Sequence, residues 1–345
     1  MLAVHAASAV LVALVVTACG SPAAAPSTTS TTAAHTSSAP QSTPQSTLPS
    51  SSASVSPPAG MVTTTVPQGP VGLAADAAGG VWVAAAVGDS LSRIDAATAA
   101  VAPAIPVGDT PLRVTVGLGS VWVTVFRDKK LVRVDPATSA VTGSVEVGRG
   151  PEGVTVAYGS VWVVAQDSGQ LVRVDPQRMA VTDRVDIGVT ARLVIPGPDG
   201  LYVAHYGSGA ILRVDPATKA VTRSATLCSG PQGMAFHAGL LWVTCTPDDL
   251  VLALDPATLT IRHRVPVPGS PDSVVAADGR VVVLAEQGPT LVVIDPAAAS
   301  VTSRAPLSDA AALDDEANLD LVVAGGTAWV SSHRQARVYA VPLPR

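Results

Sequence analysis

Short runs of β-branched and other aliphatic residues, separated by Gly, Pro and Asp, recur along the chain from about residue 68 onward. Within the stretch 149–188, for example, such runs occupy 154–157, 161–165, 171–175 and 181–187. Runs of this length between turn residues predict β-strands, and no unit shows the 3.6-residue apolar period of an amphipathic helix. The pattern predicts an all-β fold.

The strand pattern repeats with a period of 40 residues. Asp95 opens a series of turns that continues as Asp-Pro at positions 135, 175, 215, 255 and 295. The second run of a unit carries Trp at positions 82, 122, 162, 242 and 329, whereas Tyr202 and Val282 stand at the two other equivalent positions. Seven units of about 40 residues with four strands each predict a seven-bladed β-propeller.

Both motifs have a structural explanation. A large flat side chain on the second strand would fill the wedge between neighbouring blades. The aspartate of each turn can accept backbone N–H groups, and the proline presets φ for a tight turn. We therefore expect the Trp and Asp-Pro positions to build the scaffold, whatever the protein binds.

The seventh unit is incomplete, because GTAWVSS at 326–332 and RVYAVPL at 337–343 are not followed by an Asp-Pro turn or an outer strand. The segment MVTTTV at 61–66 resembles the outer strands 141–145 and 181–185. We expect this N-terminal strand to complete blade seven, since ring closure covers an otherwise exposed sheet edge.

The units also resemble a known repeat. GSVWV at 119–123, LVRVDP at 131–136 and VTGSVEVGRGPEG at 141–153 are similar to the YVTN-type propeller repeat. They also resemble the repeats of YncE-like and virginiamycin B lyase-like propellers of exported actinobacterial proteins, over about 68–345. The resemblance implies a fold rather than a function, because such propellers include binders, lyases, lactonases and scaffolds.

The N-terminal region predicts export. An apolar run at 10–16 is too short to span a bilayer, and Val16-Thr17-Ala18-Cys19 resembles the bacterial lipobox, although the segment before it has His5 and no Lys or Arg. We expect residues 1–18 to be a lipoprotein signal peptide and Cys19 to carry the lipid. This places the protein outside the cytoplasmic membrane, anchored to its outer side at the cell surface.

Residues 19–60 are expected to form a disordered stalk, because 21–60 consist almost wholly of Ser, Thr, Pro, Ala and Gln and carry no charge. All charged residues lie from Asp76 onward, so the folded domain is assigned to 61–345.

A net charge of −5 argues against nucleic-acid binding, and the apolar residues occur in runs too short for a polytopic membrane protein. We expect a monomer.

One face of the predicted propeller offers a ligand site. It combines the loops between second and third strands with those leading from a fourth strand to the next blade. The second strands end there with Ala86, Phe126, Gln166, Tyr206, Thr246, Glu286 and His333. The residues after the loop proline, or its equivalent, are Val71, Leu112, Glu152, Arg192, Gln232 and Asp272. The predicted ligand rim comprises Phe126, Glu152, Gln166, Arg192, Tyr206, Gln232 and Asp272, which vary between units while the scaffold positions do not.

Glu286 and His333 are the candidate catalytic residues, because a carboxylate and an imidazole at equivalent positions of adjacent blades could exchange protons or bind a metal. Two exposed rim side chains are the alternative. The resemblance to virginiamycin B lyase-like enzymes implies His, Glu and a magnesium ion on this face. Their aromatic WFTE strand is replaced here by VLAE at 283–286.

No other residues make a convincing metal site. His205, His237 and His263 lack metal-ligand spacing and are expected at the surface or in turns. An acidic insertion between units six and seven is expected to be a solvated loop, with Ca²⁺ binding as the alternative; it contains Asp309, Asp314, Asp315, Glu316 and Asp320. No cofactor is predicted, with Mg²⁺ or Ca²⁺ at the Glu286/His333 mouth as the alternative.

Two cysteines remain once Cys19 is lipidated. Cys228 is placed at the end of the outer strand of blade four and Cys245 at the end of the second strand of blade five. Both ends lie on the ligand face in the propeller register, and the compartment is oxidising, so we predict a disulfide between them. Two buried free thiols are the alternative.

These features favour a binding module over an enzyme. A stalked propeller with a broad concave face and no convincing catalytic set suits an envelope protein, a peptide or a small molecule as ligand. The alternative is a lyase or lactonase-like enzyme, resembling virginiamycin B lyase, with a metal-assisted site on the channel face. A purely structural envelope protein is the third reading.

Overall fold

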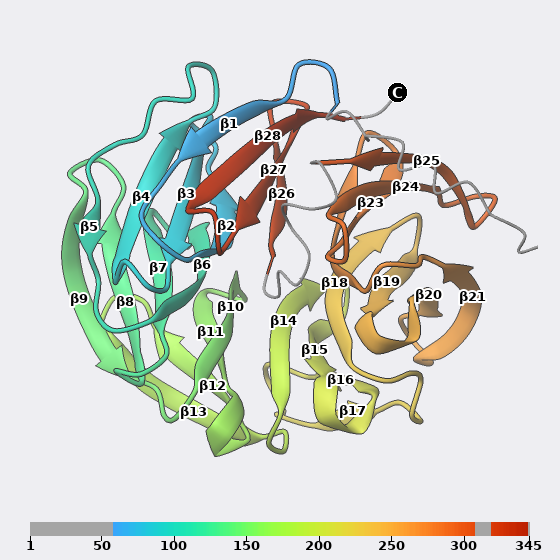
Figure 1. Ribbon diagram of the computed structural model, residues 1–345. Helices are drawn as coiled ribbons and strands as arrows, with labels where there is room; N and C mark the ends of the chain where they lie inside the picture. Colours follow the sequence, from blue (N-terminus) through green and yellow to red (C-terminus); the bar gives the residue numbers. More distant parts are fainter. Residues whose placement is uncertain (1–57, 308–318, 344–345) are drawn as a thin grey trace, which may run out of the picture. The chain divides into compact units, whose positions relative to one another are not determined.

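The computed structural model describes residues 58–307 and 319–343, which contain strands β1–β28 and three short 3-10 helices. The strands form seven four-stranded antiparallel sheets arranged as the blades of a ring (Figure 1). This confirms the predicted seven-bladed β-propeller. No helix in the described ranges is long and apolar enough to cross a membrane. The predicted signal peptide, Cys19 and nearly all of the stalk lie outside the described residues.

Blades run from the innermost to the outermost strand. Blade 1 contains β2 (Pro70–Ala75), β3 (Gly80–Ala85), β4 (Ser90–Asp95) and β5 (Ile105–Pro106). Blade 2 contains β6 (Pro111–Gly117), β7 (Ser120–Val125), β8 (Lys130–Asp135) and β9 (Ala140–Glu146). Blade 3 contains β10 (Pro151–Ala157), β11 (Ser160–Ala165), β12 (Gln170–Asp175) and β13 (Ala180–Asp186). Blade 4 contains β14 (Ala191–Gly197), β15 (Gly200–His205), β16 (Ala210–Val214) and β17 (Val221–Arg223).

The remaining blades follow the same order. Blade 5 contains β18 (Pro231–His237), β19 (Leu240–Cys245), β20 (Leu250–Asp255) and β21 (Thr260–Pro266). Blade 6 contains β22 (Pro271–Ala277), β23 (Arg280–Ala285), β24 (Thr290–Asp295) and β25 (Ser300–Pro306). Blade 7 contains β26 (Leu321–Ala324), β27 (Thr327–Ser332), β28 (Arg337–Pro342) and, outermost, β1 (Val62–Thr65). The 3-10 helices η1 (Gln166–Ser168), η2 (Tyr206–Ser208) and η3 (Thr246–Asp248) follow the second strands of blades 3, 4 and 5.

The ring closes through the N-terminal strand, as the sequence predicts. β1 pairs antiparallel with β28, in a register that places Val62 opposite Ala340 and Thr65 opposite Arg337 (Figure 1). The backbone N–H of Val66 adds a hydrogen bond of 3.0 Å to the carbonyl of Ala336. Blade 7 thus takes strands from both ends of the described chain, and β28 does not remain an open edge.

The tryptophans fill the wedges between blades, also as predicted. All five are 0–1% exposed, and each packs against the following blade; Trp82 of blade 1, for example, lies in a cluster with Val114, Val121 and Val123 of blade 2. Trp329 of blade 7 packs against blade 1 in the same way. The space between neighbouring sheets is therefore filled by an aromatic side chain, which stands at the equivalent position of the second strand in six of the seven blades.

The Asp turns are stabilised by their own side chains. Each Asp Oδ1 accepts the backbone N–H groups two and three residues later, at 2.7–3.3 Å, in the turns at Asp95, Asp135, Asp175, Asp215, Asp255 and Asp295. The backbone N–H of Thr218 in this way holds the pKa of Asp215 below its ordinary value. The turn motif is thus a local structural device.

A disulfide joins Cys228 to Cys245, with a Cα–Cα separation of 6.0 Å, and the predicted pairing is confirmed. The position of Cys228 differs from the prediction in one respect. Strand β17 ends at Arg223, so Cys228 lies in the connection to blade 5 rather than at the end of an outer strand. The bridge attaches this connection to the end of β19.

Buried hydroxyl groups tie neighbouring blades together around the channel. Thr124 donates to the Glu152 carbonyl of blade 3 at 2.8 Å, and Thr244 donates to the Asp272 carbonyl of blade 6 at 2.7 Å. Ser331 donates to the Val71 carbonyl at 2.9 Å and so joins blade 7 to blade 1. These bonds join the second strand of one blade to the innermost strand of the next at three of the seven blade junctions, and all three side chains are fully buried.

Replacing Thr124 or Thr244 by Val should therefore lower the free energy of unfolding by about 1–3 kcal/mol each, because a buried carbonyl loses its donor. The matched control is Thr222→Val on the exposed strand β17, which should change stability by no more than about 0.5 kcal/mol. Urea unfolding followed by tryptophan fluorescence measures both. Equal losses for the buried and exposed threonines would contradict this role.

Candidate functional site

The predicted rim residues sit at a backbone irregularity. In blades 1 to 6 the pairing of the innermost strand with the second strand shifts register directly after its first residue, as between Pro151 and Val154 in blade 3. A bulge of this kind re-aims side chains and is common beside functional sites. It lets residues after the loop proline contact those of neighbouring blades.

Arg192 is the centre of the contacts among these residues. Its Nε and Nη2 lie 3.0 and 2.8 Å from Glu152 Oε1 of blade 3, and its Nη1 donates to Gln232 Oε1 of blade 5 at 2.6 Å. Its guanidinium also lies 5.4 Å from the ring centre of Tyr206. Glu152 and Gln232 are both 3% exposed. The structure thus brings together four residues of the predicted rim from three consecutive blades.

A second ion pair joins Arg113 of blade 2 to Asp320, next to the first strand of blade 7, and the sequence prediction missed it. Arg113 is 7% exposed, and its Nη1 lies 3.2 Å from Asp320 Oδ2. Its Nε has no hydrogen-bond partner among the described residues. Burial alone would lower the pKa of Arg113, but the charges of Asp320, Glu152 and Asp272 outweigh it, so the pKa is raised. The sequence does carry a signal for Arg113, because it is the one charged residue in strand β6, whose other residues are apolar or uncharged.

The expectation of a solvated acidic loop is wrong for Asp320. Its carboxylate accepts hydrogen bonds from the Leu73 backbone N–H at 2.9 Å and from Ser273 Oγ at 3.2 Å, in addition to the Arg113 contact. It therefore joins blade 7 to blades 1, 2 and 6, because buried charge is retained only where partners compensate desolvation. The other members of the insertion, Asp309, Asp314, Asp315 and Glu316, lie outside the described residues.

Asp272 and Glu286 form the acidic side of the channel. Asp272 is 3% exposed, and Glu286 is 9% exposed. Burial and the charge of Glu286 raise the pKa of Asp272 well above its ordinary range; Asp320 adds to this, while Arg113 and Arg192 act in the opposite direction. A carboxyl in such surroundings favours its protonated form.

The candidate pair Glu286 and His333 lies in two different surroundings. Glu286 Oε1 accepts the Leu319 backbone N–H at 3.3 Å, and Glu286 is electrostatically coupled to Asp272 on its own blade. His333 is half-buried and lines a cavity to which Glu286 does not contribute. The carboxyl group that interacts with Glu286 is that of Asp272. The sequence prediction places Asp272 in the ligand rim and does not pair it with Glu286.

A cavity of about 590 Å³ opens at the channel mouth over blades 1 to 4 and blade 7. Of the predicted ligand rim, it includes Phe126, Glu152, Gln166 and Arg192, whereas Tyr206, Gln232 and Asp272 lie outside it. Arg113 lines both this cavity and a smaller one of about 170 Å³ between the innermost strands. The remaining lining residues are Val71, Ala86, Val87, Asp89, Asp109, Thr110, Leu112, Arg127 and His333.

The three scattered histidines behave differently from one another. His205 is only 6% exposed, which corrects the expectation of a surface or turn residue. Burial, followed by the nearby charge of Arg223, lowers the pKa of His205, so its neutral form is favoured. His237 is half-buried and His263 is exposed.

The donor set at the channel does not fit a divalent metal. Across residues 58–307 and 319–343, no three His, Cys, Asp or Glu side chains are arranged to hold an ion. Glu152 is paired with Arg192, Asp320 is paired with Arg113, and Glu286 accepts a backbone N–H. Binding a hard cation would require these carboxylates to leave their present partners.

Comparison with known proteins identifies the fold. No protein-family model and no curated protein sequence matches the chain. Among solved structures, virginiamycin B lyase from Staphylococcus aureus superposes with a TM-score of 0.71 at 16% identity, covering 82% of this chain and 100% of that chain. A structure described as streptogramin B lyase gives a TM-score of 0.70 at 14% identity, covering 81% and 96%.

A protein of different function matches almost equally well. Hydrazine synthase of Kuenenia stuttgartiensis gives a TM-score of 0.68 at 14% identity, covering 81% of this chain and 97% of that chain. Identities this low establish the fold alone, and function must be argued from the site. The chain shares the seven-bladed β-propeller fold of virginiamycin B lyase-like proteins.

Proposed function

We propose that the protein is a membrane-anchored, extracytoplasmic binding module that holds its ligand at the channel mouth. The observation that carries this proposal is the cavity of about 590 Å³, whose rim is contributed by five blades. A concave site of this volume, mostly pre-formed and with a few polar groups, is typical of small-molecule binding.

The chemistry of the cavity favours binding over proton transfer. Glu152 and Arg192 are engaged with each other, so they form a rigid polar floor. Phe126 offers an apolar face, and the side-chain amide of Gln166 offers hydrogen bonds. A small molecule or the end of a peptide from an envelope protein, with an apolar part and a hydrogen-bond acceptor, fits these groups best.

A thermal-shift screen of residues 52–345 against amino acids, dipeptides, sugars and divalent metals should therefore yield ligands whose stabilising effect depends on this cavity. Phe126→Ala and Gln166→Ala should each reduce the affinity of such a ligand about tenfold or more, because each removes a direct contact. Phe236→Ala, at a half-buried ring outside the cavity, is the matched control. Ligands that bind both cavity variants with unchanged affinity would contradict the proposed site.

The proposed location follows from the lipobox-like segment ending at Cys19, the uncharged stalk and the disulfide between Cys228 and Cys245. Structural disulfides persist in oxidising compartments outside the cytoplasm. The membrane would then be contacted through the lipid, and the propeller would stand away from it.

Cys19→Ala should release the protein from the membrane fraction or block its processing, since no other side chain at that position can accept the lipid. Fractionation and intact-mass measurement of the exported protein test this, with Cys228→Ala as a control that removes a cysteine elsewhere. Normal processing and membrane retention of Cys19→Ala would refute the anchor.

An enzyme of the lyase or lactonase class is the second candidate. It is favoured by one observation, the buried carboxyl of Asp272, whose pKa is raised by burial and by the charge of Glu286, because a carboxyl that favours its protonated form can act as a general acid. Virginiamycin B lyase, a propeller of the same fold, is an enzyme. For this chain the role depends on Asp272 holding a proton in the folded state.

Proton retention at Asp272 predicts a specific pH dependence. Its pKa is higher in the folded than in the unfolded chain, so the contribution of Asp272 to stability should be fully present at acidic pH and be lost as pH rises through the folded-state pKa. Asp272→Asn should remove this loss and be relatively more stable at neutral pH. Melting temperatures from pH 4 to 8 measure it, with the exposed Asp186→Asn as control. Parallel profiles for wild type and Asp272→Asn would exclude a retained proton.

A further inference from the structure

One blade has no aromatic side chain at the point of the second strand where the other six have one, although Tyr339 of blade 7 packs into the same buried cluster as the valine found there. Six blades place a buried aromatic side chain at the same point of the second strand: Trp82, Trp122, Trp162, Tyr202, Trp242 and Trp329. Blade 6 has Val282 there. Its partner on the third strand is Val293, where blades 1 to 4 have an arginine. Val282 is therefore smaller than all its counterparts, and Val293 is smaller than the arginines of blades 1 to 4 but larger than Ala253 and Ala340 of blades 5 and 7.

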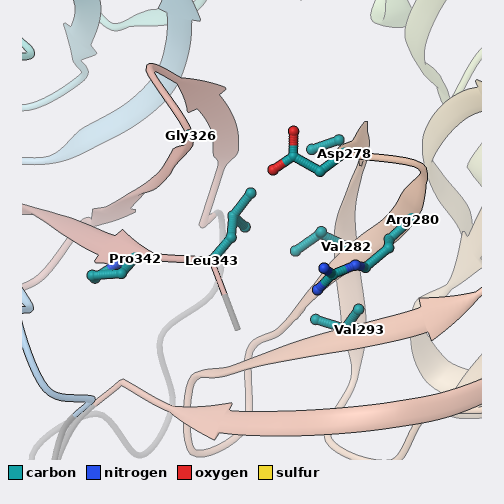
Figure 2. Close-up of a pocket in the computed structure, with 8 residues that line it drawn as sticks. Asp278, Arg280, Val282, Val293, Gly326, Pro342 and Leu343 are labelled. Atoms are coloured by element: carbon teal, nitrogen blue, oxygen red, sulfur yellow. The ribbon is translucent and has the colours of Figure 1, made fainter. Parts of the chain in front are cut away.

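A cavity of about 240 Å³ lies at this place, between blades 6 and 7 (Figure 2). Val282 and Val293 line it from blade 6, and Gly326, Pro342 and Leu343 line it from blade 7. For comparison, Trp242 of blade 5 packs against Val274, Val281 and Val283 of blade 6, the blade that follows it. We call this cavity the blade 6–7 slot. It is lined by Val282, which stands where the other blades carry an aromatic residue, and by its cross-strand partner Val293.

The slot also has the hydrogen-bond acceptor that an indole uses elsewhere in the ring. The indole N–H groups of Trp122, Trp162 and Trp242 donate to the carbonyl five residues earlier, at 2.9, 3.2 and 3.4 Å. Those carbonyls belong to the last residue of each first strand. In blade 6 the equivalent residue is Ala277, which lines the slot.

The chain has no unused ring to place in the slot. All eleven aromatic residues lie between Trp82 and Tyr339 and within the described ranges, and six of them are the rings of the other blade junctions. The other five are Phe126, Tyr158, Tyr206, Phe236 and Tyr339, none of which lines the slot. A ring that occupies the slot must therefore come from another molecule.

Size and access permit this. A buried apolar cavity of about 150 Å³ is enough to bind benzene. The slot is larger, and Asp278, Gly326 and Pro342 at its edge are exposed to solvent. The side chains of Asp278 and Arg280 extend from the blade 6 turn beside the slot, so its mouth is polar while Val282 and Val293 form an apolar interior (Figure 2).

We propose that the blade 6–7 slot is a binding site for a planar aromatic ring of indole size with an N–H donor at its edge. The ring would stack between the two blades, with its N–H directed at the carbonyl of Ala277. The ligand is an indole compound, either free or as the tryptophan side chain of a peptide. This site is separate from the channel mouth and does not depend on the function proposed for it.

Indole and N-acetyl-tryptophanamide are the probes, tested on residues 52–345. Indole should bind with a stoichiometry of one and raise the melting temperature by about 2–4 °C at roughly a hundredfold excess over its Kd. Val282→Trp should fill the slot, raise the melting temperature without ligand and abolish indole binding. Val282→Phe, a smaller change, should weaken binding at least tenfold and covers the case in which the Trp variant does not fold.

Trp242→Val provides the matched positive control, since it should open a second slot between blades 5 and 6 and increase the stoichiometry towards two. Binding of both probes would indicate that a peptide side chain is accepted, and binding of indole alone would assign the slot to a free molecule. Indole binding that is unchanged in Val282→Trp or Val282→Phe would overturn the proposal. Absence of indole binding to the wild-type protein would overturn it as well.

Discussion

The fold depends on filling the space between neighbouring blades. Twisted four-stranded sheets arranged in a ring diverge from one another away from the channel, and the gap must be filled with apolar side chains if the ring is to be stable. A single ring at the centre of each second strand does this at six junctions. The repeat of about 40 residues places this aromatic side chain at the equivalent position of the second strand in six blades. The blade 6–7 slot marks the one junction where the repeat does not supply it.

Once the wedges are filled, the inner strands can carry chemistry. Three hydroxyl groups, on Thr124, Thr244 and Ser331, join the second strand of one blade to the innermost strand of the next, and the last of them joins blade 7 to blade 1. The bulges at the start of the inner strands then release the residues after the loop proline from the regular pairing. The result is a stable ring whose channel residues interact across blades. Function at this face can vary without altering the wedges.

Carboxylates from several blades meet at the channel. Arg113 and Arg192 pair with Asp320 and Glu152, and on blade 6 the charge of Glu286 acts on Asp272. Burying both as anions would be unfavourable, so the proton affinity of Asp272 rises. The basic side of the channel, with Arg113 and Arg192, faces the large cavity at the mouth, whereas Asp272 and Glu286 do not line it. This separation supports ligand binding at the mouth and confines any proton chemistry to blade 6.

The sequence by itself determined the fold, the closing strand and the disulfide. The fold follows from the repeated unit, and the closing strand and the disulfide follow from the register that the repeat imposes on the ends of the chain and on the two cysteines. Tertiary structure alone decided how Arg113 meets Asp320, why Asp320 is not in a solvated loop and why Glu286 interacts with Asp272 rather than with His333. Asp320 and its partner Leu73 are 247 residues apart, and their contact exists only because the ring is closed. Side-chain partners across a channel follow from the geometry of seven blades together, which no single repeat contains.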